Sequence, residues 1–274
     1  MLEKNKVGSA ITRIGVALGG GFARGMAHIG VVGVLAAAYA SATNVSELSD
    51  IAYRLKRSDV ARWGLSRFAI ANTTPMTRFL PRLLKCRRFE EMNIPLCAVA
   101  TDLAGGRPVI FRDRGDVIEA VRGSCAYPGL FHPVQYAGGF LIDGTFSMEV
   151  PAAPLRQMGA TKVIAVNLKT KSPGRVPSNA FEVVNRCFAI LHNRMEMAWR
   201  SECDLVIEPD LGAKEWNCFR SAANLIAAGE EAATAAIRKW FESGPPPVSS
   251  LSAKASKKKE TMESITSLCV QRGC

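Results

Sequence analysis

The order of apolar and polar positions along the chain predicts short strands that alternate with helices. Apolar runs of strand length lie at 13–18, 95–101, 108–111, 162–168 and 204–208. Two further short runs, 134–136 and 140–142, flank Gly138 and Gly139, which predicts a hairpin. Helical periodicity is expected over 46–55 and onward to Phe89, and over 116–122, 180–200 and 221–241. This alternation is typical of an α/β layered fold with a largely parallel sheet.

Length and composition are those of one compact domain followed by a tail. The chain has 274 residues, of which 48% are hydrophobic and 22% charged, and this is enough to bury a full core. We expect the domain to cover residues 11–243. The remainder, 244–274, is rich in Pro, Ser and Lys and is predicted to be disordered.

Neither a membrane span nor a secretory signal is predicted. The longest apolar stretch free of charge and His, 29–42, is shorter than the roughly twenty apolar residues of a transmembrane helix. Arg13 and Arg24 interrupt any signal-peptide core, so we expect a cytoplasmic protein. The eight cysteines are scattered without metal-ligand spacing and are expected to be buried, reduced thiols. No metal or cofactor is expected.

Positive charge is concentrated in residues 54–88, here called the basic segment. The chain has a net charge of +11, and this segment holds ten Arg and Lys against a single acid, Asp59. Near an anionic membrane each exposed basic residue adds about 1 kcal/mol of binding. The segment therefore predicts peripheral contact with anionic phospholipid or, equally, a solvated helical face. Nucleic acid is not expected, because no recognition helix, zinc finger or stacking-aromatic pattern is present.

Two local motifs can carry chemistry. Gly19, Gly20 and Gly21 follow an apolar strand and precede a helical stretch, so their backbone amides could hold a phosphate or the oxyanion of an acyl-transfer intermediate. A purely structural tight turn is a third interpretation. Dinucleotide binding is less favoured, because it needs an acidic residue that ends a second strand about twenty residues later. At that distance this sequence has 44–47, which is predicted to be the start of a helix. The second motif is Asp143-Gly144, directly after an apolar strand, which could present a carboxylate to a cleft but is more often a simple turn.

Taken together, four blocks of sequence resemble those of patatin-like phospholipases of the bacterial type. They are Leu18-Gly-Gly-Gly-Phe-Ala-Arg-Gly-Met-Ala-His-Ile-Gly30, Ala98-Val-Ala-Thr-Asp-Leu103, Ser124-Cys-Ala-Tyr-Pro-Gly-Leu-Phe131 and Ile142-Asp-Gly-Thr145. The blocks come in the family's order, and the resemblance covers about residues 11–240. It implies a patatin-like three-layer α/β fold and a Ser-Asp dyad that hydrolyses phospholipid or other lipid esters.

The resemblance also implies roles for individual residues. Asp143 would be the base of the dyad. The oxyanion hole would be formed by Gly19, Gly20 and Gly21 with the turn at Arg24 and Gly25. Phe22 departs from the family pattern, which often has another glycine at this position. His28 is expected to be a packed helix residue and not a base.

The nucleophile that this chemistry needs is missing from the sequence. A serine hydrolase of this kind carries G-x-S-x-G at a sharp turn between a strand and a helix, and no such string occurs in the chain. The nearest string, at 64–68, lacks the second glycine. Where the family would have a strand and this elbow, Leu35 is followed directly by Ala36, so roughly twenty residues of helix, strand and turn are absent.

Without that segment the central elbow strand of the sheet is predicted to be missing, which leaves neighbouring strands unpaired. The covalent step cannot then occur, and the chain is predicted to be catalytically inactive although its family hydrolyses lipid esters. The alternative is a lipid-binding or regulatory pseudoenzyme that uses the remaining apolar cleft and the basic surface without chemistry.

Overall fold

The structure is a computed structural model that describes residues 12–20, 40, 45–64, 69–169, 176–212 and 222–242. The chain divides into two compact units, 1–234 and 235–274. Of the second unit, only the end of helix α8 (Ala222–Glu242) lies within the described residues. The strands and the candidate functional residues all belong to the first unit.

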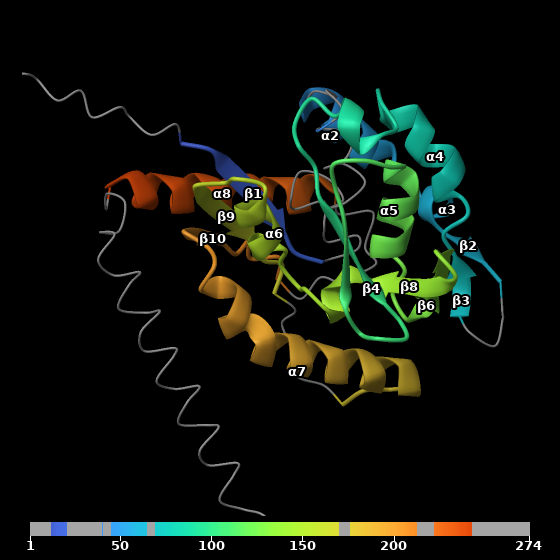
Figure 1. Ribbon diagram of the computed structural model, residues 1–274. Helices are drawn as coiled ribbons and strands as arrows, with labels where there is room; N and C mark the ends of the chain where they lie inside the picture. Colours follow the sequence, from blue (N-terminus) through green and yellow to red (C-terminus); the bar gives the residue numbers. More distant parts are fainter. Residues whose placement is uncertain are drawn as a thin grey trace, which may run out of the picture. The chain divides into compact units, whose positions relative to one another are not determined.

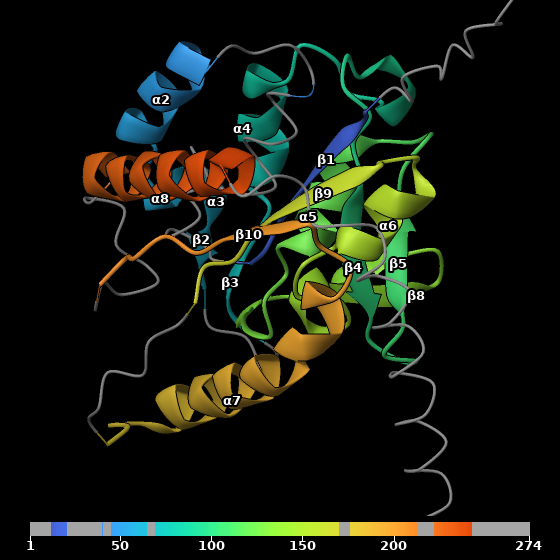
Figure 2. The same ribbon diagram turned by 90° about the vertical axis from the view of Figure 1, so that its left-hand side faces the viewer.

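Three parallel strands form one sheet, in the order β1-β9-β10. They are β1 (Ile14–Leu18), β9 (Lys162–Val166) and β10 (Leu205–Ile207). Ile14 pairs with Lys162 and Leu18 with Val166, so two strands that are far apart in the sequence lie side by side (Figure 2). Val163 and Ala165 of the central strand are fully buried, as expected for a parallel strand that is covered on both faces.

Four antiparallel strands form a second sheet, in the order β5-β4-β8-β7. They are β4 (Ala98–Asp102), β5 (Pro108–Phe111), β7 (Val134–Tyr136) and β8 (Gly139–Asp143). The hairpin between β7 and β8 turns at Ala137 and Gly138, whose φ angles of 47° and 82° match a two-residue turn with positive φ. A small third sheet, in the order β2-β3-β6, contains β2 (Arg62–Trp63), β3 (Ala69–Asn72) and β6 (Gly129–Phe131).

Helices cover these sheets and carry the connections between them. Beside α8, the helices are α2 (Val45–Arg54), α3 (Arg57–Val60), α4 (Met76–Leu83), α5 (Val117–Ser124), α6 (Ala152–Gln157) and α7 (Ala180–Arg200), with 3₁₀ turns η2 (Phe89–Glu91) and η3 (Gly144–Phe146). Asp116 caps α5, because its Oδ1 accepts hydrogen bonds from the amides of Ile118 and Glu119. Asn179 caps α7 through the amide of Glu182.

The main core lies around α5. This helix packs against β4 and β8 on one side and against α4 on the other (Figure 1). Val117 and Val121 of α5, Leu80 of α4 and Phe131 of β6 are almost completely buried there. Because α5 is anchored in this core, the residues that follow it on the way to β6 are held in place beside β8.

The fold class is confirmed, since strands and helices alternate and the parallel sheet is present. The strands expected at 108–111 and the helix expected at 180–200 have the predicted bounds. The parallel part is smaller than the alternation predicts, because short connections join β4 to β5 and β7 to β8, and such connections favour antiparallel pairing.

Two expectations were wrong. Helix was expected throughout the region from 46 to Phe89, but β2 and β3 interrupt it. In β3 the buried Ala69 and Ala71 alternate with the exposed Ile70, a strand pattern too short to distinguish by periodicity alone. The described cysteines are free thiols but are not buried as expected: Cys187 is exposed on α7, and the others are only partly buried, namely Cys86, Cys97, Cys125 and Cys203.

Strand β1 is incompletely covered in the described part of the chain. Its paired neighbour there is β9, and its side chains Ile14 and Val16 are 56% and 53% exposed. Such exposure is unusual for a strand of a parallel sheet, which helices normally cover on both faces. The predicted deletion at Leu35-Ala36 and the bounds of the predicted tail, 244–274, lie outside the described residues. Among the helices that are described, none is both long and apolar enough to cross a membrane.

Candidate functional site

Asp143 lies where β8 ends and η3 begins. Its Oδ1 accepts two hydrogen bonds from Thr145, one from the backbone amide at 2.9 Å and one from the hydroxyl at 2.8 Å. The amide of Asp143 donates to the carbonyl of Ala126, just after α5. The carboxylate is therefore held in one orientation by its own turn, and the turn is fixed to the core helix.

Burial makes this carboxyl group an unusually weak acid. Desolvation raises the pKa of Asp143 to about 6, although the two hydrogen bonds from Thr145 act in the opposite direction. A carboxylate with a pKa close to neutrality is a better proton acceptor than an exposed one. Asp143 thus has the electrostatic property required of a general base.

Gly144 permits the turn because no side chain would fit at its position. A Cβ on Gly144 would lie 2.1 Å from the carbonyl oxygen of Val99 in the neighbouring strand β4. Backbone cannot move aside as a side chain can, so only glycine allows this approach. The glycine after Asp143 is therefore explained by packing, and the same packing places the carboxylate at the end of the inner strand β8.

The structure brings the start of the glycine turn to the Asp143 turn. A Cβ on Gly20 would lie 2.3 Å from Cγ2 of Thr145, the residue that binds the Asp143 carboxylate. Gly19 is next to Val150, and its amide donates to the carbonyl of Val166 at 3.0 Å. The Gly19 amide is therefore used by the parallel sheet, and any oxyanion would depend on the amides after it.

The remaining residues of the predicted oxyanion hole, Gly21, Arg24 and Gly25, lie outside the described residues, as does His28. Of the predicted site, the structure thus brings together Gly19, Gly20 and Asp143. The oxyanion role of the glycine turn stays a prediction.

Sequence reasoning missed the residues that support Asp143. The hydroxyl of Thr101, on β4, donates to the backbone carbonyl of Asp143 at 2.8 Å and lies 2.8 Å from the hydroxyl of Ser147. Thr101 is only 2% exposed. It belongs to one of the quoted blocks, Ala98-Val-Ala-Thr-Asp-Leu103, where a threonine within an apolar strand was the signal that could have identified it. Thr145, in the block around Asp143, has the more direct role.

An aromatic cluster covers the other side of the Asp143 turn. Phe146 of η3 packs edge-to-face on Phe188 of α7, with ring centroids 4.7 Å apart. Tyr127 and His192 also contact the Phe146 ring. The hydroxyl of Tyr127 donates to Asn185 of α7. Burial lowers the pKa of His192, although the nearby Glu149 opposes this shift. These contacts attach α7 to the site and give it an apolar wall.

Two side chains near Asp143 carry a potential nucleophile, and neither is suited to attack. Ser147 is hydrogen-bonded to Thr101 and directly follows the 3₁₀ turn, so it is not at a strand-to-helix elbow. Burial, reinforced by the charge of Asp143, raises the pKa of Cys125 to about 12, so this thiol does not form a thiolate near neutral pH.

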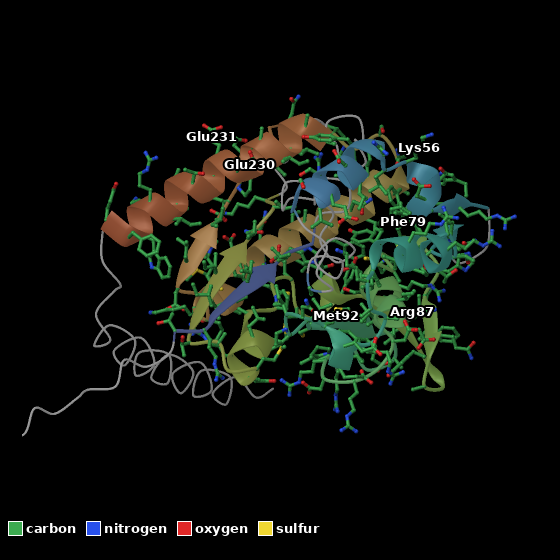
Figure 3. All side chains as sticks on the ribbon, turned by 90° about the horizontal axis from the view of Figure 1, so that it is seen from above. Lys56, Phe79, Arg87, Met92, Glu230 and Glu231 are labelled. Carbon is green, nitrogen blue, oxygen red and sulfur yellow. The ribbon has the colours of Figure 1, made fainter. Side chains whose placement is uncertain are left out.

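The basic segment is partly neutralised within the described residues. Lys85 pairs with Glu47, Arg87 with Asp116, and Arg88 with Glu90. Lys56 and Arg87, which lie near the two ends of the segment, are labelled in Figure 3. Arg62, Arg78 and Arg82 are exposed and form no ion pair with the described acids, so most of the surplus charge faces solvent.

Known proteins resemble this chain in sequence over its central part. Residues 33–156 match a family model described as patatin-like phospholipase. An NTE family protein of Mycobacterium tuberculosis is 30% identical over 188 residues, which cover 61% of this chain and 52% of that protein. The lysophospholipase NTE1 of Mycosarcoma maydis is 27% identical over 57% of this chain and 10% of its own length. The chain thus spans about half, or less, of the length of these curated relatives.

One solved structure, that of VipD from Legionella pneumophila, matches 70% of this chain and 41% of its own. The TM-score is 0.28 and the sequence identity 14%, a likeness too weak to bear on fold or function.

Proposed function

We propose, from the match of residues 33–156 to a patatin-like phospholipase family model, that this chain is a lipid acyl-hydrolase domain that has lost the ability to form the acyl-enzyme. The proposal rests on the observation that the candidate base is present while the nucleophile motif is absent. Asp143 is half-buried and is held in one orientation by Thr145, the residue that Gly20 approaches, while no G-x-S-x-G string occurs in the 274 residues.

The chemistry explains why half a site is insufficient. In a Ser-Asp dyad the serine Oγ attacks the ester carbonyl and gives its proton to the carboxylate, while backbone amides stabilise the oxyanion. The proton then passes to the leaving alcohol, and water later releases the fatty acid. Without the serine Oγ no acyl-enzyme can form, and Asp143 has no hydroxyl to deprotonate.

An ester assay tests this proposal. The chain is expected to hydrolyse p-nitrophenyl esters no faster than buffer. Inserting a strand and a G-x-S-x-G elbow of roughly twenty residues between Leu35 and Ala36 is expected to create turnover. The same insert with Ala in place of its Ser, and the insert combined with Asp143→Asn, are the matched controls and should both be inactive. Turnover by the unmodified chain that is abolished by Asp143→Asn would overturn the proposal.

Retained lipid binding is the functional role we propose for the inactive domain. The support is the basic segment, where Arg62, Arg78 and Arg82 are exposed without ion pairs to described acids, and which lies within the part of the chain that matches a patatin-like phospholipase family model. Such a surface should bind anionic phospholipid as a peripheral protein and weaken with salt.

Vesicle co-sedimentation tests this role. Binding is expected to vesicles that contain anionic lipid, at low salt, and not to purely neutral vesicles. The double variant Arg78→Gln/Arg82→Gln should bind several-fold more weakly. Arg87→Gln/Arg88→Gln removes the same charge from residues already in ion pairs and should have a smaller effect. Absence of binding at low salt would leave the domain without this role.

A further inference from the structure

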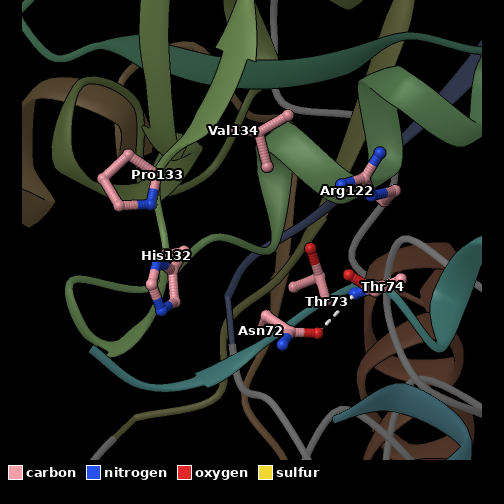
Figure 4. Close-up of a pocket in the computed structure, with 7 residues that line it drawn as sticks. All are labelled: Asn72, Thr73, Thr74, Arg122, His132, Pro133 and Val134. Atoms are coloured by element: carbon pink, nitrogen blue, oxygen red, sulfur yellow. Dashed lines mark hydrogen bonds between the residues drawn. The ribbon is translucent and has the colours of Figure 1, made fainter. Parts of the chain in front are cut away.

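A polar pocket separate from the Asp143 turn lies between β3, α5 and the segment that joins β6 to β7. Its volume is about 270 Å³, and it is lined by Asn72, Thr73, Thr74, Arg122, His132, Pro133 and Val134 (Figure 4). Five of these seven side chains are polar or charged. None is acidic, so the single formal charge in the lining is the guanidinium of Arg122.

The side chain of Arg122 has a hydrogen-bond donor that lacks an acceptor in the described structure. Its Nε is buried and has no hydrogen-bond partner among the residues that the structure describes. A buried donor without a partner costs free energy, and a charged one costs more than a neutral one, so such groups in folded proteins generally have a protein, water or ligand partner. The requirement can be met by an acceptor that enters the pocket, and an anionic acceptor would also compensate the charge.

The walls of the pocket are fixed before any ligand binds. Oδ1 of Asn72 accepts a hydrogen bond from the amide of Thr74 at 3.1 Å, which is the dashed line in Figure 4. The carbonyls of Thr73 and Thr74 accept from the first residues of α4. The amide of His132 donates to the carbonyl of Ala71, so the far wall is tied to β3. Fixed walls lower the entropic cost of binding.

The surroundings of the pocket are positive. Asn72, Thr73 and Thr74 lie within the basic segment, and Arg62 is the register partner of Asn72 in the β2–β3 pair. Arg78, one turn of α4 further on, is exposed. A positive surface around a pocket that contains an arginine raises the local concentration of anions and favours their entry.

Size and polarity together select the class of ligand. The pocket is large enough for a phosphate group with its water molecules, and it is below the range typical of sites for larger organic ligands. Arginine is well suited to phosphate, since the guanidinium offers several N–H donors in one plane, and threonine hydroxyls can donate as well. Only Pro133 and Val134 offer an apolar surface, which is too little for an acyl chain.

We propose that this pocket binds a phosphate group through Arg122, with the hydroxyl of Thr73 as a second donor. The phosphate group can be carried by a lipid headgroup at the membrane surface or by a small soluble molecule. This binding does not involve Asp143 and does not require ester hydrolysis. The phosphate proposal is therefore independent of the proposed loss of acyl-enzyme chemistry.

Titration with inorganic phosphate tests the proposal, with chloride at equal ionic strength as the reference and binding followed by calorimetry and by the melting temperature. Saturable binding is expected for the full chain. Arg122→Gln should weaken it about tenfold or more, because it removes the charge and the buried donor. Arg82→Gln removes the same charge from the surface of α4, outside the pocket, and should change the affinity less than about twofold.

A second variant keeps the test valid if Arg122→Gln does not fold, as judged by circular dichroism. Thr73→Val conserves shape and net charge but removes the hydroxyl, and it should also weaken phosphate binding. The proposal is overturned if phosphate has no saturable effect beyond chloride. It is also overturned if Arg122→Gln and Thr73→Val fold and bind as the unmodified chain does, or if Arg82→Gln loses as much affinity as Arg122→Gln.

Vesicles identify the source of the phosphate. If the ligand is a lipid headgroup, vesicles with phosphatidic acid should bind better than vesicles with phosphatidylserine, and Arg122→Gln should remove that preference. Phosphate binding that depends on Arg122, without any Arg122-dependent preference among vesicles, would identify a soluble phosphate compound as the ligand.

Discussion

Gly20 faces Thr145 so closely that a Cβ on Gly20 would lie 2.3 Å from Thr145 Cγ2. Thr145 in turn donates two hydrogen bonds to Asp143, so the glycine turn and the candidate base share one contact residue. Two motifs that are far apart in the sequence are therefore one site, and a side chain at Gly20 would disturb both.

Gly20→Ala is expected to destabilise the protein by about 1–3 kcal/mol, the usual cost of overpacking a fixed contact. The obstructing atom is the methyl group of Thr145, so Thr145→Ser should relieve much of the loss while it keeps the hydroxyl that binds Asp143. Urea unfolding of the two single variants and the double variant measures the coupling. A loss that is unchanged in the Thr145→Ser background would show that the two residues are not in contact.

Gly144→Ala is expected to be more harmful, with a loss of about 2–4 kcal/mol, because the obstructing atom is the backbone oxygen of Val99. Neighbouring substitutions cannot relieve a clash with the main chain. Gly64→Ala, where no atom lies within 4 Å of the new Cβ, is the control for the glycine-to-alanine change itself and should lie within about 0.5 kcal/mol of the unmodified protein. Equal unfolding midpoints for the two variants would contradict this close approach.

Asp143 should make the protein less stable as the pH rises. Burial raises its folded pKa to about 6, above the ordinary value of 3.8, so between these values the folded state holds a proton that the unfolded state has released. The stabilisation is present below about pH 4 and is lost as the pH passes about 6, by about 1–3 kcal/mol in total.

Asp143→Asn removes this titration. The variant should be close to the unmodified protein in stability at pH 4 and more stable at pH 7.5, as measured by urea unfolding across that range. A stability difference between the two proteins that does not change with pH would mean that the carboxyl group of Asp143 titrates normally.

Asp204 should behave in the opposite way. Burial by itself would raise its pKa, but hydrogen bonds from the amide of Val163 and from Lys162 and Arg156 lower it overall. Its contribution is therefore present above the ordinary carboxyl pKa and is lost as the pH falls below about 4. Asp204→Asn leaves two cations beside a weaker acceptor and should cost about 2–4 kcal/mol at pH 7.

Asp113→Asn is the matched control for this change, because Asp113 is largely exposed and its ion pair, with Arg112, lies at the surface. Its effect on the unfolding free energy should be below about 1 kcal/mol. If the two variants lose the same stability, the network around Asp204 does not hold β9, β10 and α6 together.

The sequence by itself determined the features that depend on neighbours along the chain. Periodicity and glycine positions were sufficient to predict β5, α7 and the hairpin after β7, and the motif order pointed to Asp143 and the glycine turn. They were sufficient also to show that no G-x-S-x-G string is present. Where the local signal was weak it failed, as in the four residues of β3, which lie in a region that otherwise has helical periodicity.

The tertiary structure decided everything that depends on residues distant in the sequence. The contact of Gly20 with Thr145, the raised pKa of Asp143 and the support from Thr101 arise only when separate strands pack together and exclude water. The same holds for the pocket around Arg122, whose lining comes from three separate stretches of the chain. Hydrophobic periodicity reports which face of an element is buried, but not which element covers it, and in this protein the covering elements create the chemistry.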